Sequence, residues 1–250
     1  MTMTESDEAL AERLATAAGV ILLALQKSGE FADKALGKAG DARANAMLMH
    51  ELRAARPEDA ILSEEEKDSV ARCSFSRVWV VDPLDGTREY SEGRSDWAVH
   101  VALAVDGVPT VGAVALPGLG LTLTSGAPKP LAPANVPPKM LVSRTRPAAE
   151  AVFVAEKMGA ELLGMGSAGA KAMAVVRGEA DIYLHTGGQY EWDNCAPAAV
   201  AAAAGLHVSR VDGSSLVYNC ANPYLPDLLI CRKEFAAEAL RLAAEFVAAE

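Results

Sequence analysis

The sequence predicts an α/β protein of two halves, an α+β N-terminal half followed by an α/β C-terminal half. Apolar residues first repeat at helical spacing and then alternate with a period of two, and later short apolar runs alternate with helical stretches. Between these patterns, the segment 127–139 contains five prolines and is the sharpest change of composition in the chain. We therefore expect a boundary there, with domains over 1–130 and 131–250.

Two helices are expected at the start of the N-terminal half. Thr4 or Ser6 can cap the first helix, whose apolar residues recur at helical spacing. This apolar stripe consists of Leu10, Leu14, Ala17, Ile21 and Leu25. A second helix is expected to start at Asp41 and to stop before Pro57, since the residue before a proline disfavours helical geometry.

The rest of this half should form an antiparallel sheet covered by the two helices. Asp106-Gly107 is a typical hairpin turn between two alternating runs. The strands are expected at 60–63, 77–81, 97–105, 108–115 and 121–124.

The C-terminal half alternates short strands with helices, which is the pattern of an α/β unit. Its strands are expected at 140–143, 161–163, 182–184 and 227–232. Its helices are expected after Pro147, from Ser167, from Trp192 and from about Glu234.

Composition excludes several classes of partner. With 250 residues, 51% of them hydrophobic, the chain can bury a large core. Its net charge of −10 argues against a nucleic-acid polymer or an anionic membrane as partner, because no basic surface is available to release counterions. Small phosphorylated substrates are compatible with this negative charge if metal ions neutralise their phosphates.

Cytoplasmic location is expected. The N-terminus is acidic and lacks the basic region of a secretory signal, and the apolar run 17–25 is too short to span a bilayer. The four cysteines have no C-x-x-C spacing and should be reduced and mostly buried. They are Cys73, Cys195, Cys220 and Cys231.

The segment 80–87, Val-Val-Asp-Pro-Leu-Asp-Gly-Thr, ends an apolar run with two carboxylates, Asp82 and Asp85. Pro83 restricts the backbone and Gly86 permits a tight turn, so both acids should face one pocket. Asp, Pro and Gly are also common in ordinary turns, and this alternative reading stays open for the segment alone.

Two further acidic clusters favour a metal site. Glu64-Glu65-Glu66 lies upstream and Glu191-Trp192-Asp193 far downstream. Carboxylates gathered from distant segments typically hold Mg²⁺ together with substrate phosphates, and without a cation they would repel one another.

Three motifs at these places carry a family resemblance. Ser63-Glu64-Glu65, the segment 82–87 and Trp192-Asp193 resemble the lithium-sensitive, Mg²⁺-dependent phosphatase superfamily that contains inositol monophosphatase, fructose-1,6-bisphosphatase and 3'(2'),5'-bisphosphate nucleotidase. The resemblance runs from about 33 to 222. It implies a layered αβαβα sandwich, a phosphatase with two or three Mg²⁺ ions per site, inhibition by lithium and a homodimer.

The resemblance also implies the metal ligands and a proton relay. The ligands are Glu64, Asp82, the carbonyl of Leu84, Asp85 and Asp193. Any of the three consecutive acids Glu64, Glu65 and Glu66 could supply the first ligand, and the family pattern favours Glu64. The hydroxyl of Thr87 can relay a proton from the attacking water to a carboxylate, or Thr87 can cap a helix.

The relay partner is Asp33 or Asp41. The segment 33–41 resembles a family stretch of the form D-x-S-P-V-T-x-A-D, but only its two end acids match. We favour Asp33 as a loop-borne catalytic acid, with Asp41 as the alternative, either as the base or only as the cap of the second helix.

The C-terminal half should hold the substrate. Gly166 and Ser167 open a helix with Lys171 four residues later, an arrangement suited to a second phosphate and similar to the bisphosphate-nucleotidase branch. Lys171 can instead be a helix lysine that reaches solvent. The other substrate-binding candidates are Gly86, Thr87, Ser143, Arg144 and Glu191. His185 stands where an arginine is expected, and a structural role for it stays open.

This branch implies removal of the 3'-phosphate of adenosine 3',5'-bisphosphate to give AMP, with phosphoadenosine phosphosulfate as a related substrate and a role in sulfur assimilation. The alternatives within the superfamily are inositol phosphate and fructose bisphosphate.

Two classes of function compete with a phosphatase. Residues 164–169 spell G-x-G-x-x-G, which occurs in NAD-binding oxidoreductases, but the run is late in the chain and leaves the acidic motifs unexplained. A non-catalytic metal-binding protein is the other alternative. A phosphatase with an aspartyl nucleophile would need D-x-D-x-T, one residue shorter than D-x-x-D-x-T here.

Overall fold

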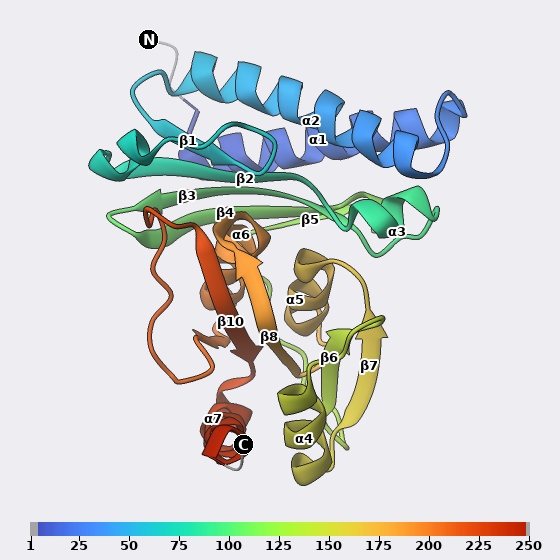
Figure 1. Cartoon of the computed structure of the whole chain (residues 1–250), viewed down its shortest axis with the longest axis vertical. Coiled ribbons are helices and arrows are strands. Elements are labelled where there is room, and N and C mark those ends of the chain that lie inside the picture. The colour runs from blue at the N-terminus through green and yellow to red at the C-terminus, as the bar shows by residue number, and fades with distance from the viewer. Residues whose placement is uncertain (1–4, 249–250) are drawn as a thin grey trace.

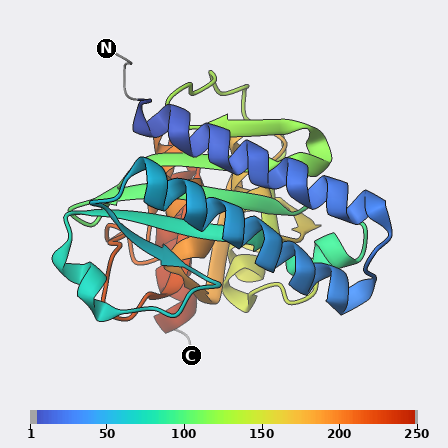
Figure 2. The same ribbon diagram turned by 90° about the horizontal axis from the view of Figure 1, so that it is seen from above.

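A computed structural model describes residues 5–248 as five stacked layers. Helices α1 (Asp7–Ser28) and α2 (Asp33–Ala55) form the first layer and lie side by side across one sheet (Figures 1 and 2). Below that sheet come α5 (Ala168–Val176) and α6 (Glu191–Ala203), a second sheet, and finally α4 (Ala149–Met158) and α7 (Lys233–Ala248). The αβαβα sandwich implied by the family resemblance is therefore confirmed.

The first sheet has the order β1-β2-β3-β4-β5, with β1 parallel to β2 and the other neighbours antiparallel. Its strands are β1 (Ala60–Ser63), β2 (Arg77–Asp85), β3 (Ala98–Val105), β4 (Val108–Leu116) and β5 (Leu121–Thr124). Asp106 and Gly107 both have positive φ, 50° and 78°, as the tight turn between β3 and β4 requires. The strand β2 extends to Asp85, which carries both acids of its motif into the sheet.

The second sheet has the order β7-β6-β8-β10-β9. Its strands are β6 (Lys139–Ser143), β7 (Glu161–Met165), β8 (Ile182–Tyr190), β9 (His207–Ser209) and β10 (Tyr224–Cys231). The sequence did not predict β9, because a three-residue strand gives too little alternation to detect.

The start predicted for the second helix was wrong. Helix α2 begins at Asp33 rather than Asp41, because the segment 33–41 has no proline or β-branched residue to interrupt it. Asp41 is therefore inside the helix and is not its cap. Ser6 caps α1 by accepting a hydrogen bond from the Ala9 amide (3.2 Å), whereas Thr4 lies outside the described residues.

The two halves share a core. One apolar cluster joins residues of the first sheet, such as Val80 and Val114, to residues of the second sheet, such as Tyr183 and Ile230. We propose that 1–130 and 131–250 are the two domains, held together by this cluster.

The prediction for the cysteines was right in part. All four thiols are free, and Cys195 and Cys231 are buried, but Cys73 and Cys220 are exposed. Among the described residues, no helix has the length and apolar character needed to cross a membrane.

Candidate active site

The acids of two distant motifs meet where β2 ends and α6 begins. Asp82 and Asp85 come from β2, and Asp193 comes from the first turn of α6. One carboxylate oxygen of each lies within 4.8 Å of the others. Gly86 follows with a φ of 89°, and a Cβ there would lie 3.1 Å from the Cβ of Ser167, so only glycine allows β2 to turn into α3 (Thr87–Ser91) at this place.

The carboxylates of the cluster are not fully balanced by positive charge. Burial and the neighbouring Glu64 and Asp85 raise the pKa of Asp82 well above its usual range. Burial and Asp193 raise the pKa of Glu64 to about 7, and burial and Asp85 raise that of Asp193 to about 6. Carboxylates that resist ionisation together are the donor set that a hard divalent cation stabilises, so these residues fit such an ion.

Asp85 is the exception in the cluster. Its Oδ2 accepts hydrogen bonds from the Ser167 hydroxyl (2.5 Å) and the Gly169 amide (2.6 Å), and its Oδ1 accepts one from the Ala168 amide (3.1 Å). Although burial would raise its pKa, His100 and these donors lower it to about 2. Asp85 therefore stays ionised and also caps helix α5, which ties the two halves together at the site.

His100 is the site residue that sequence reasoning missed. It is fully buried on β3, with Nε2 3.1 Å from Asp85 Oδ2, at an angle poor for a hydrogen bond, and Nδ1 3.0 Å from the Trp192 carbonyl. Asp85 raises the pKa of His100 against the effect of burial. A Cβ on Gly169 would lie 2.1 Å from Nε2, so the third glycine of G-x-G-x-x-G makes room for this ring. Nothing in a lone histidine within a strand pattern signals such a position.

The structure separates the two candidates for the relay. Asp41 is buried, its Oδ1 has no hydrogen-bond partner, and burial, Glu65 and Glu64 raise its pKa to about 7. Asp33 is exposed at the start of α2, where it lines a surface hollow with Thr87, Arg88 and Ser91. Asp41 has the raised pKa that a base needs, whereas Asp33 shares a hollow with Thr87, so the identity of the relay partner stays a prediction.

Thr87 is the first residue of α3, and the alternative that it caps a helix was wrong, because Gly86 occupies the cap position. Its hydroxyl donates to the Leu84 carbonyl at 3.1 Å. The predicted backbone ligand and the predicted relay group are thus in direct contact.

The three glutamates after β1 have different surroundings. Burial and the charge of Asp193 raise the pKa of Glu64, and an interaction with Asp82 lowers it, so both aspartates act on Glu64. Glu66 pairs with Arg53 (3.1 Å) and accepts from Asn45 (2.9 Å), which directs it away from the cluster. The assignment of Glu64 as ligand stays a prediction that these contacts support.

The predicted phosphate site at the start of α5 is already engaged. The first amides of this helix donate to Asp85, and the Gly166 amide donates to Asp96 (2.8 Å). Lys171 is buried, donates to the Ser167 carbonyl (2.6 Å) and lies over the Tyr183 ring, so it does not reach solvent. Its pKa is lowered by burial.

The remaining substrate candidates mostly contact protein. Arg144 pairs with Glu89 (2.8 Å) and Glu92 (2.6 Å) of the α3 region, and the Ser143 hydroxyl accepts from the Arg146 amide. Both Glu191 oxygens accept backbone hydrogen bonds, from Asn219 (2.7 Å) and Cys220 (2.8 Å). His185 contacts the Gly188 carbonyl, as in the structural reading of that residue.

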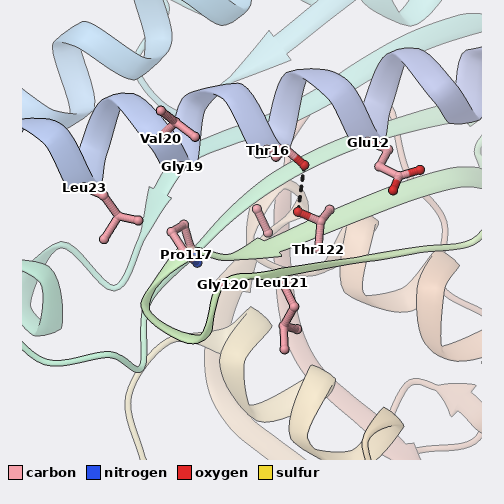
Figure 3. Close-up of a pocket in the computed structure, with 10 residues that line it drawn as sticks. Glu12, Thr16, Gly19, Val20, Leu23, Pro117, Gly120, Leu121 and Thr122 are labelled. Carbon is pink, nitrogen blue, oxygen red and sulfur yellow. Dashed lines mark hydrogen bonds between the residues drawn. The ribbon is translucent and has the colours of Figure 1, made fainter.

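Another hollow lies on the α1 side of the first sheet, between α1 and the β4–β5 connection (Figure 3). Gly19 lets Pro117 approach α1 closely, and the Thr16 and Thr122 hydroxyls are 2.8 Å apart. Glu12 is its one carboxylate, so it offers no set of metal ligands.

The raised pKa values predict a pH-dependent stability without metal. Asp41, Glu64 and Asp193 bind protons more tightly when folded, so they stabilise the fold at low pH, and this stabilisation is lost as pH rises from about 4 through about 7. Urea unfolding in a chelator should give an unfolding constant at least about 10-fold larger at pH 8 than at pH 5. Saturating Mg²⁺ should remove this difference; an equally steep dependence with Mg²⁺ would contradict the prediction.

Comparison with known proteins gives similarities along most of the chain. The sequence model described as the inositol monophosphatase family matches residues 3–248. The chain is 50% identical over 248 residues to the 3'-phosphoadenosine 5'-phosphate phosphatase of Mycobacterium leprae, covering 92% of this chain and 91% of that protein. It is 31% identical over 206 residues to the 3'(2'),5'-bisphosphate nucleotidase CysQ of Escherichia coli K12, covering 78% and 84%. The crystal structure of CysQ from Bacteroides thetaiotaomicron matches the fold with a TM-score of 0.79, at 24% identity over 93% of this chain and 99% of that one.

Proposed function

Because this chain belongs to the inositol monophosphatase family and is a phosphatase, we propose that it removes the 3'-phosphate of adenosine 3',5'-bisphosphate, in an Mg²⁺-dependent reaction that yields AMP. The observation that carries the substrate is the similarity to the mycobacterial phosphatase along nearly the whole chain. The matched bisphosphate nucleotidase of Escherichia coli supports the same substrate class.

Divalent metals serve this family, and the acidic cluster would hold them here through Glu64, Asp82, the Leu84 carbonyl, Asp85 and Asp193. When bound, Mg²⁺ neutralises the phosphate and makes a water molecule more acidic. Asp85 contributes a carboxylate that is ionised before any cation arrives, because His100 and the start of α5 lower its pKa.

Thr87 and Asp41 would move the proton of the attacking water. Gly37 lies one helical turn before Asp41 on α2, and a Cβ on Gly37 would lie 2.6 Å from Thr87 Cγ2, so that face of α2 packs on Thr87. A carboxylate whose pKa is about 7 is suited to accept a proton at neutral pH. We therefore propose Asp41 as the general base, with Thr87 orienting the water.

The second phosphate of the substrate would be attracted by cations of the C-terminal half. Lys171 acts on the charges of Asp85 and Asp193, and Arg144 joins β6 to α3 across the junction of the halves. To bind the phosphate, Lys171 would have to give up its contact with the Ser167 carbonyl, or Arg144 its pair with Glu89. The remaining candidates would shape the site. The side chains of Ser143, Ser167 and Glu191 accept hydrogen bonds from backbone amides. The Gly166 amide donates to Asp96, and Gly86 leaves room for Ser167.

The proposal also includes phosphoadenosine phosphosulfate as a substrate, a role in sulfur assimilation, a cytoplasmic location, a homodimer and inhibition by lithium. These parts rest on the family resemblance.

Phosphate release from a substrate panel tests the proposal. Adenosine 3',5'-bisphosphate, inositol 1-phosphate and fructose 1,6-bisphosphate would each be assayed with Mg²⁺, with a chelator, and with LiCl against NaCl. We expect metal-dependent release with the highest kcat/KM for the nucleotide, lowered by millimolar lithium. A higher kcat/KM for inositol or fructose phosphate would overturn the substrate assignment while leaving the phosphatase intact.

A further inference from the structure

We propose that Tyr190 and Tyr224, backed by Trp192, form a stacking surface for the purine base of the nucleotide substrate. The inference rests on the proposed function and deepens it by assigning residues that select a nucleotide over other phosphate esters. Tyr190 and Tyr224 are paired at one end of β8 and β10, and Trp192 lies in the first turn of α6. Figure 1 shows β8, β10 and α6 close to one another.

The three rings form one aromatic assembly. Tyr190 lies parallel to Trp192, with ring centroids 4.7 Å apart and planes 7° apart. Tyr224, the residue paired with Tyr190 across the two strands, stands edge-on to it with centroids 5.9 Å apart. Stacked and edge-to-face contacts are the arrangements that aromatic rings prefer, so the rings hold one another in fixed orientations.

The backbone is adapted to these rings. Gly188 has a φ of 92°, and a Cβ at that position would lie 2.4 Å from the Tyr224 hydroxyl and 2.6 Å from its ring. The preceding Gly187 has a φ of 109°. Two glycines with positive φ near the end of β8 leave room for the Tyr224 side chain directly against the strand.

The assembly is exposed although it contains large rings. The chain is only 5% aromatic, yet three aromatic residues meet here, with Tyr190 44% and Tyr224 45% exposed. Stability does not explain two tyrosines left half in water, because burial is what makes an aromatic ring stabilising. Rings that are ordered by one another and half exposed can stack with a ligand at little entropic cost.

The assembly adjoins the reacting end of the site. The Tyr190 amide donates to Asp193 Oδ2 at 2.6 Å. The residue that carries this ring therefore also positions Asp193, a proposed metal ligand. Lys171, by contrast, lies on α5, and its charge lowers the pKa of Asp193. A nucleotide with its 3'-phosphate at the acids extends in two directions from the ribose, towards a base and towards a 5'-phosphate. We assign the cations to the 5'-phosphate and the aromatic rings to the base.

The occupant follows from this chemistry. Every nucleobase presents a flat π-face, and stacking on an aromatic side chain contributes to binding without hydrogen-bond readout. Inositol and fructose phosphates have no such face. The aromatic assembly therefore distinguishes nucleotides from these esters by binding, and it leaves the phosphate chemistry unchanged.

The test compares the wild-type enzyme with Tyr190→Ala, Tyr224→Ala and the conservative Tyr190→Phe. The Tyr190 amide that binds Asp193 is retained in all of them. Each variant would be assayed on adenosine 3',5'-bisphosphate and on an abasic analogue, 1,4-anhydroribitol 3,5-bisphosphate, and AMP binding would be measured by calorimetry. We expect each alanine variant to raise the KM for the nucleotide and the Kd for AMP by about 5- to 100-fold, with kcat within about twofold.

The abasic analogue should be turned over equally by wild type and variants, and Tyr190→Phe should behave as wild type, since phenylalanine keeps the π-face. Equal losses on nucleotide and abasic analogue would overturn the inference, because the rings would then be only structural. An unchanged KM and AMP affinity in both alanine variants, with wild type still preferring the nucleotide over inositol phosphate, would overturn it while the proposed function survives. A wild-type enzyme with no preference for the nucleotide would remove the proposed function itself, and the inference with it.

Discussion

Replacing Asp82 by asparagine should lower metal-dependent phosphate release by about 10³-fold or more. Asp82 is buried at the centre of the acidic cluster, and asparagine keeps its size but removes the charge that would hold the cation. A metal ion supplies several kcal/mol of transition-state stabilisation, and each 1.36 kcal/mol corresponds to a factor of ten in rate. The measurement is kcat/KM for adenosine 3',5'-bisphosphate at saturating Mg²⁺.

The same substitution should stabilise the metal-free protein. The pKa of Asp82 is raised because burial and the neighbouring carboxylates disfavour its charge, so a neutral amide relieves that repulsion at pH 7. The melting temperature in a chelator should therefore rise, and the further rise caused by Mg²⁺ should shrink.

A matched control is Asp106→Asn in the β3–β4 turn. Asp106 is exposed with a φ of 50°, a conformation that asparagine also accepts. Activity and melting temperature should not change. Near-normal activity of Asp82→Asn, or a lower melting temperature in the chelator, would contradict this account of the cluster.

Asp181→Asn should destabilise the fold by about 3–5 kcal/mol without touching the site. Asp181 is fully buried and accepts from Arg232 Nε (2.8 Å) and from the amides of Asn135 (3.1 Å) and Lys139 (2.9 Å). It thus fastens the end of the proline-rich connection onto the second sheet. Without the carboxylate, the buried Arg232 guanidinium would lose its counter-charge.

Urea unfolding at pH 7 would measure this effect. The double variant Asp181→Asn/Arg232→Met should recover part of the loss, because it removes the unpaired charge. Glu179→Gln breaks the more exposed pair with Arg177 and should change stability by no more than about 1 kcal/mol. A single variant as stable as wild type would show that the pair does not hold the connection in place.

Most elements could be predicted from the sequence because their local signals agree with the fold. The strand 121–124 was predicted to the residue, and the Asp106-Gly107 turn was confirmed by its positive φ values. The error at α2 has the opposite cause. The start was placed at Asp41 because an aspartate can cap a helix. In the structure Gly37 and Gly40 pack closely against Thr87 and Tyr90 within a helix that begins at Asp33, and this packing is not visible in local propensity.

For the site, too, some properties could be predicted from the sequence and others depend on the tertiary structure. Three acidic motifs carried the resemblance that indicated the family, the phosphatase chemistry and the candidate ligands, and their carboxylates alone predicted a site for a hard cation. Only the tertiary structure decided how those carboxylates differ. It buried Asp41 beside Glu64 and Glu65, placed His100 against Asp85, and used the start of α5 for that carboxylate. These properties depend on desolvation and on contacts between residues far apart in the chain, which spacing along the sequence does not encode.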